Sequence, residues 1–167
     1  MKNRKRGFSL VELLIVLAVI AALIATITPV ALNAIKKAKA TQVAQNLKTL
    51  ASAIENLLYV EGADELANAS FSKLGRDISS DYQLVVVDLG TGEFKAWATY
   101  KKDDVDDGLV GDIISNATKT TSDISYTIGS GETLYTIDST GIATKTTGEV
   151  KAVPANSIYY SFTFAVY

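Results

Sequence analysis

The chain contains no cysteine and no histidine. The lack of cysteine excludes disulfide bonds and metal sites that are built on thiolates. The lack of histidine removes the commonest general base and the commonest side-chain ligand of transition metals. Both absences weigh against an enzyme, and we predict neither a catalytic residue nor a cofactor.

Positive charge is also scarce over most of the chain. Four of the 16 basic side chains lie in residues 1–7, so the remainder carries 12 basic against 18 acidic side chains. Binding to nucleic acid requires concentrated positive charge for the phosphates. An acidic body therefore argues against nucleic acid as a direct partner.

Charge is absent altogether from Leu13 to Ile35. As a helix at ~1.5 Å per residue, this run spans about 35 Å, enough to cross a bilayer core of ~30 Å with some tilt. It is too long for the apolar part of a signal peptide, ~7–15 residues. The basic residues before it are expected to stay cytoplasmic, which places the C-terminal body on the far side of the membrane.

A short motif precedes this apolar run and reads Gly7-Phe8-Ser9-Leu10-Val11-Glu12. The motif resembles the prepilin cleavage site that type IV pilins share with the pseudopilins of type II secretion. The resemblance implies that a membrane aspartyl peptidase cleaves between Gly7 and Phe8 and methylates the new amine of Phe8. It covers roughly the first third of the chain, and Pro29 occupies the place of a proline that is usual in the family.

Glu12 is the residue of this motif with the clearest physical consequence. A carboxylate at the start of a membrane helix is costly unless it is paired or neutralised. The resemblance implies that Glu12 of one subunit pairs with the Phe8 amine of its neighbour and so sets the axial offset in a filament. Two alternatives remain open: an intramolecular pair, because Phe8 lies one turn away, and a carboxylate that reaches the headgroup region.

Pro29 interrupts the hydrogen bonding of the apolar helix, because proline has no N–H and clashes with the preceding turn. One interpretation is a simple bend in a membrane helix. The other, taken from related pili, is local melting of residues 26–29 on assembly. The β-branched residues Thr26, Ile27 and Thr28 favour melting, because they lower helix propensity.

The period of the apolar residues changes after the lysines that follow Ile35. Val43, Leu47, Leu50, Ile54 and Leu57 recur at spacings of four and three, which predicts an amphipathic helix with one buried stripe. Gly62 is a plausible end of this helix. We therefore expect one helix from Ser9 to Tyr59.

Alternating sequences after residue 81 predict an antiparallel sheet with one apolar face that covers this stripe. We predict a hairpin of Tyr82–Asp88 with Glu93–Tyr100, and a second hairpin of Ile124–Ile128 with Thr133–Asp138. Further strands are expected at Ile142–Thr147 and Ser157–Tyr167, a loop with a short helical turn at 62–81, and a short helix within 108–118. The predicted fold class is α+β.

An acidic cluster between the two hairpins is the only candidate metal site. Asp103, Asp104, Asp106 and Asp107 precede Gly108 and offer oxygen ligands of the kind that calcium prefers. Their spacing does not match an EF-hand. A solvated acidic loop is the alternative, and it is the one we favour.

Together these observations predict a leader at 1–7, a long helix at 8–61 whose residues 8–35 form the transmembrane segment and filament core, and a β-rich head at 62–167. The predicted function is a structural subunit of a type IV pilus for adhesion, motility or DNA uptake. A pseudopilin of type II secretion and a membrane-anchored enzyme or binding protein are the alternatives.

The partners implied by the resemblance are other copies of the chain, prepilin peptidase, the assembly machinery and the inner membrane. The implied location is the cytoplasmic membrane as a single-pass precursor, and then an extracellular filament.

Overall fold

The computed structural model describes residues 8–75 and 78–166. The chain divides into two compact units, residues 1–38 and 39–167. Helix α1 (Leu10–Glu61) contributes to both, and its two parts are described separately. The predicted α+β class is confirmed, since this long helix accompanies a sheet of six antiparallel strands.

The unit of residues 39–167 is built on the second part of α1. All five residues of the predicted stripe are buried there in one cluster with the sheet. Four further α1 residues are buried beside the stripe: Ala40, Ala44, Ala51 and Leu58. With these residues, the helix buries a wider face than the stripe alone.

Helix α1 ends at Glu61, two residues later than expected. Gly62 then adopts a φ of 88°, and its N–H donates to the Leu58 carbonyl at 3.0 Å. A positive φ is readily available to glycine and costly for other residues. Gly62 is therefore the helix stop that the sequence predicts.

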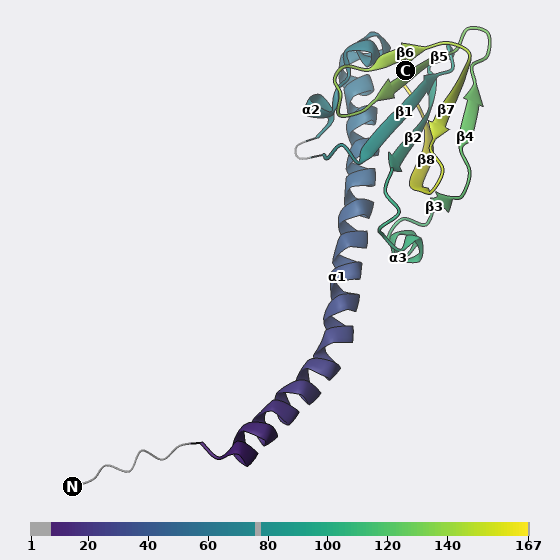
Figure 1. Ribbon diagram of the computed structural model, residues 1–167. Helices are drawn as coiled ribbons and strands as arrows, with labels where there is room; N and C mark the ends of the chain where they lie inside the picture. Colours follow the sequence, from purple (N-terminus) through teal and green to yellow (C-terminus); the bar gives the residue numbers. More distant parts are fainter. Residues whose placement is uncertain (1–7, 76–77, 167) are drawn as a thin grey trace. The chain divides into compact units, whose positions relative to one another are not determined.

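The remaining elements follow α1 in chain order (Figure 1). The helical ones are short: the 3₁₀ helix η1 (Ala63–Asn68), α2 (Phe71–Leu74) and α3 (Asp107–Gly111). The first four strands are β1 (Tyr82–Asp88), β2 (Glu93–Tyr100), β3 (Ala117–Thr120) and β4 (Ile124–Thr127). The last four are β5 (Thr133–Ile137), β6 (Thr144–Thr146), β7 (Glu149–Val153) and β8 (Ser157–Ala165).

The main sheet has the order β3-β8-β2-β1-β5-β6, and every pair is antiparallel. Strands β1 and β2 form the hairpin that the sequence predicts, with Tyr82 opposite Tyr100 and Asp88 opposite Phe94. Gly90 in the turn has a φ of 72°, and a Cβ built there would lie 2.9 Å from the Gly131 carbonyl oxygen. Only glycine therefore fits at this position.

The other face of the main sheet is covered as well, which corrects the expectation of a single apolar face. Strands β4 and β7 pair with each other as a separate two-stranded sheet. They enclose a second apolar cluster that includes Val85, Val87 and Trp97 of the main sheet and Val153 of β7. Strand β1 is consequently buried on both sides, which explains its unbroken run of valines.

The predicted pairing of the second hairpin is wrong. Strands β4 and β5 both form close to the predicted residues, but β4 pairs with β7, and β5 pairs with β1 and β6. Alternation identifies a strand and its two faces, whereas its partner depends on contacts far along the chain. Strand β7 was not predicted, although Glu149–Ala152 alternates between charged and apolar residues.

The region predicted as a short helix at 108–118 is divided between two elements. Helix α3 ends at Gly111, and Ala117 already begins β3, which pairs with β8. Asp106 caps α3, because its carboxylate accepts hydrogen bonds from the N–H groups of Gly108 and Leu109. The expected strand at Ile142–Thr147 is shorter, because only Thr144–Thr146 pair with β5.

Candidate functional site

The start of α1 contains a local structure that the sequence analysis did not anticipate. The Glu12 carboxylate accepts a hydrogen bond from the Ser9 N–H at 2.9 Å, and the Ser9 hydroxyl accepts one from the Val11 N–H at 3.3 Å. The contacts form a variant of the capping box: Glu12 satisfies the Ser9 amide, and the Ser9 hydroxyl caps the amide of the second helical residue instead of the third. The Ser-x-x-Glu spacing is the sequence signal that would have revealed it.

Glu12 therefore has an intramolecular hydrogen-bond partner before any assembly occurs. Phe8 stands beside the cap with 82% of its surface exposed. Cleavage after Gly7 would convert the Phe8 amide into an ammonium group. The preceding residue, Gly7, lies outside the described residues, as does the basic leader.

Every residue from Phe8 to Ala38 is exposed in the single chain. This part of α1 is long and apolar enough to span a membrane. Leaving so many large apolar side chains in water is unfavourable by about 25 cal/mol for each Å² of apolar surface. The segment consequently requires an apolar environment from outside the chain.

Helix α1 continues through Pro29. The hydroxyl of Thr26 donates to the Leu23 carbonyl at 2.9 Å, and the hydroxyl of Thr28 donates to the Ile24 carbonyl at 2.7 Å. Both hydroxyl groups are therefore hydrogen-bonded within the helix, as an apolar environment requires, and such bonds to the preceding turn are associated with bending of the helix. Local melting concerns an assembled state, and it stays a prediction.

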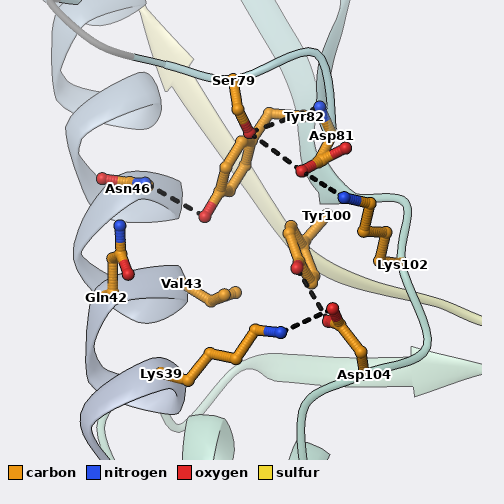
Figure 2. A pocket seen from close by; sticks show the side chains of 10 residues that line it. All are labelled: Lys39, Gln42, Val43, Asn46, Ser79, Asp81, Tyr82, Tyr100, Lys102 and Asp104. Atoms are coloured by element: carbon orange, nitrogen blue, oxygen red, sulfur yellow. Dashed lines mark hydrogen bonds and ion pairs between the residues drawn. The ribbon is translucent and has the colours of Figure 1, made fainter.

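A second candidate site lies within the unit of residues 39–167. It is a polar cleft of about 210 Å³ between the second part of α1 and the end of the β1–β2 hairpin (Figure 2). Helix α1 contributes Lys39, Gln42, Val43 and Asn46. The strands and loops opposite contribute Ser79, Asp81, Tyr82, Tyr100, Lys102 and Asp104. We call this set the polar cleft.

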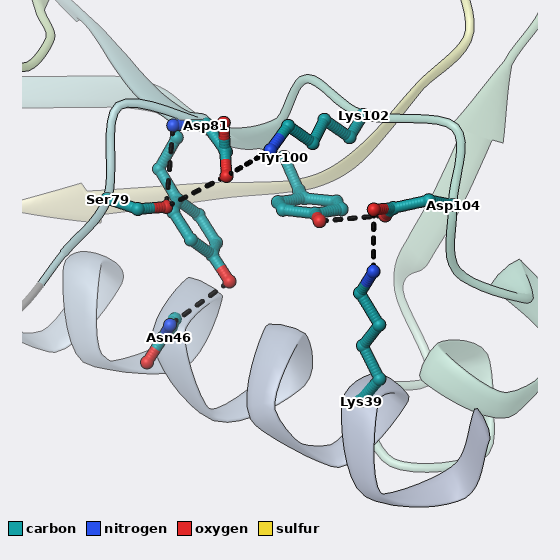
Figure 3. Close-up of polar contacts among 8 residues, drawn as sticks. Lys39, Asn46, Ser79, Asp81, Tyr100, Lys102 and Asp104 are labelled. Atoms are coloured by element: carbon teal, nitrogen blue, oxygen red, sulfur yellow. Dashed lines mark hydrogen bonds and ion pairs between the residues drawn. The ribbon is translucent and has the colours of Figure 1, made fainter. Parts of the chain in front are cut away.

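The charged groups of the polar cleft form two ion pairs (Figure 3). Lys39 contacts Asp104 at 2.5 Å, and Lys102 contacts Asp81 at 2.8 Å. The Lys39 ammonium holds the pKa of the Asp104 carboxyl below its usual value of 3.8. Lys102 does the same for the pKa of Asp81, so both carboxylates are charged at neutral pH.

The two tyrosines lie between these ion pairs and are almost fully buried. The Tyr100 hydroxyl donates to Asp104 at 2.8 Å, and the Tyr82 hydroxyl accepts from the Asn46 side-chain amide at 3.0 Å. Burial raises the pKa of both phenols, and the Asp104 carboxylate raises that of Tyr100 further. The sequence contains no signal for this site, because its residues come from segments far apart in the chain.

The four aspartates of the acidic cluster have different surroundings. Asp103 pairs with Lys119 at 2.6 Å, Asp104 with Lys39, and Asp106 with the amides at the start of α3. Within residues 8–75 and 78–166, no group of three or more acidic side chains is arranged to hold a metal ion. The calcium site thus gains no support from this geometry and remains only a weak hypothesis.

Residues 2–28 match the family model described as the prokaryotic N-terminal methylation motif, which is the signature of type IV pilins and pseudopilins. No curated protein and no solved structure gives a significant match. The resemblance that Gly7–Glu12 predicts is thereby confirmed for the N-terminal segment. It supports a pilin-like or pseudopilin protein that prepilin peptidase processes, with a structural role.

Proposed function

We propose that this chain is a structural subunit of a type IV pilus. The observation that carries the proposal is the methylation motif at residues 2–28, at the start of a helix whose apolar residues are all exposed from Phe8 to Ile35. In this proposal, residues 1–7 are a leader, residues 8–35 are first a membrane anchor and then the filament core, and residues 62–167 form the head on the filament.

The exposed apolar helix supports self-association as the step after cleavage. A bilayer covers this surface in the precursor, and the equivalent helices of other copies cover it once the subunit leaves the membrane. The bilayer and the helix bundle are similarly apolar, so little apolar surface of the helix is exposed to water before or after the subunit moves from one to the other. The assembly machinery has then only to supply the work of extraction.

Glu12 and Phe8 supply the register in this proposal. The new ammonium of Phe8 and the Glu12 carboxylate are each costly in a dry helical bundle, and less so as a pair. The capping box keeps Glu12 at the helix start, next to the site of cleavage. Pairing between subunits requires that Glu12 give up, or share, its hydrogen bond from Ser9.

Processing is tested by mass spectrometry of the N-terminal peptide from the native host. The expected mature chain starts at N-methylated Phe8 and has 160 residues, which is 167 less the 7 of the leader. Gly7→Val should leave the leader attached, because a branched side chain then stands at the cleavage site. A mature chain that starts at Met1, or beyond Phe8, would contradict the assignment.

The pilus is distinguished from a secretion pseudopilus by shearing cells and imaging the sheared fraction. Surface filaments composed of the mature chain support the pilus. Processed chain that stays with the cells, together with loss of protein secretion when its gene is deleted, would instead support a pseudopilin.

A further inference from the structure

The polar cleft has features of a binding site that go beyond filament assembly. We propose that it binds a neutral, hydroxyl-rich ligand of the size of a single hexose. The cleft's volume, its balance of charge and its hydrogen-bonding groups without a partner among the described residues all fit such a ligand.

The charges in the cleft cancel. Two ammonium groups face two carboxylates, and each is already paired, so the site offers no net charge to an anion or to a cation. Each ammonium nevertheless keeps donor capacity beyond its ion pair, since a lysine has three N–H donors. The Asp81 carboxylate keeps an acceptor, because Ser79 and Lys102 both bond to its Oδ2.

The neutral polar groups show the same mixture of donors and acceptors. The buried Tyr82 hydroxyl accepts from Asn46, and its own proton has no acceptor among the residues that the structure describes. The exposed amide of Gln42 at the rim likewise has no hydrogen-bond partner in residues 8–75 and 78–166. In Figure 2 the Tyr82 hydroxyl reaches from the strand side of the cleft to Asn46 on α1, and Gln42 lies one helical turn from Asn46.

A hydroxyl group is the ligand chemistry that matches such a site, because each hydroxyl both donates and accepts a hydrogen bond. One hydroxyl of a sugar can accept a hydrogen bond from a lysine while the neighbouring hydroxyl donates one to a carboxylate. A volume of about 210 Å³ equals roughly seven waters at ~30 Å³ each, which suits one sugar ring. Val43 and the tyrosine rings supply the apolar surface for its C–H groups.

The test uses the full chain in a zwitterionic detergent without a sugar headgroup. Saturation-transfer NMR is recorded with glucose, galactose, mannose, N-acetylglucosamine and N-acetylgalactosamine, and with N-acetylneuraminic acid as an acidic probe. We expect saturable transfer to at least one neutral hexose, little dependence on salt, and weaker transfer to the acidic sugar.

Two variants place the binding in the cleft. Tyr82→Phe and Gln42→Ala should each weaken binding by roughly two- to tenfold, the value of one net hydrogen bond. The control for Tyr82→Phe is Tyr59→Phe, because the Tyr59 hydroxyl donates to the Ala165 carbonyl outside the cleft. The control for Gln42→Ala is Gln45→Ala, because Gln45 lies on the same helix but does not line the cleft. Both control variants should bind the sugar as the wild type does. Gln42 is exposed, so its variant should fold normally.

Three results would overturn the proposal: no transfer to any neutral hexose, undiminished binding by both cleft variants, or preference for the acidic sugar. None of them bears on filament assembly, because the N-terminal motif takes no part in this experiment. A chain that forms filaments and binds no hexose would refute the cleft alone.

Discussion

Glu12 caps the start of α1 and is proposed to pair with the Phe8 amine of another subunit, and a series of three substitutions separates these two functions. As the acceptor in the capping box, Glu12 needs only a side-chain oxygen that reaches the Ser9 N–H. As the partner of the Phe8 amine, it needs a negative charge. Glu12→Gln keeps the first and removes the second, whereas Glu12→Ala removes both.

The size of the effect follows from burial. In the single chain the start of α1 is exposed, so loss of the cap alters only the first turn and leaves the unit of residues 39–167 folded. In a dry filament core, removal of one partner of an ion pair costs about 3–5 kcal/mol. Since 1.36 kcal/mol corresponds to a tenfold change in an equilibrium constant, the affinity of each added subunit for the filament falls by two to nearly four orders of magnitude.

The assay is filament yield after shearing, measured beside the amount of processed chain in the membrane. We expect few or no filaments from Glu12→Gln and Glu12→Ala, an intermediate yield from Glu12→Asp, and normal cleavage in all three. Wild-type yield from Glu12→Gln with loss in Glu12→Ala would show that capping matters and charge does not. Normal yield from all three would refute both roles.

Three further predictions concern the unit of residues 39–167, each measured by unfolding of the detergent-solubilised full chain. Leu47→Ala should destabilise by about 2–5 kcal/mol, because this fully buried leucine leaves a cavity under the sheet; Lys48→Ala on the exposed face is the control and should change little. Asp104→Asn should cost no more than about 1 kcal/mol, because its pair with Lys39 is partly exposed. Folding lowers the pKa of Asp104, so the stability that its ionised form contributes is present above the usual value of 3.8 and is lost as pH falls through the lower folded pKa. The free energy of unfolding should therefore depend less on pH at acid pH in Asp104→Asn than in the wild type. Thr99→Val should be neutral or stabilising, because the buried Thr99 hydroxyl has no partner among the described residues; clear destabilisation would reveal an unseen partner such as a bound water.

The short-range patterns of the sequence were sufficient for several elements. The stripe from Val43 to Leu57 predicts both the helix and its buried face, because a helix places every third or fourth residue on one side. The β1–β2 hairpin follows from two segments rich in β-branched and aromatic residues and a glycine-rich turn between them. The methylation motif is a local signal too, since a peptidase reads contiguous residues. The capping box is a local signal as well, because Ser9 and Glu12 have the Ser-x-x-Glu spacing.

Only the tertiary structure decided which strands are neighbours. Strand β5 joins β1 rather than the adjacent β4, and β4 crosses to the other face with β7, because burying both faces of β1 and β2 covers more apolar surface than two separate hairpins would. The polar cleft likewise exists only after folding brings Lys39 and Asp104, 65 positions apart, into contact. Local sequence determined most of the elements and the methylation motif, whereas the partners of strands and charges depended on burial of the whole chain.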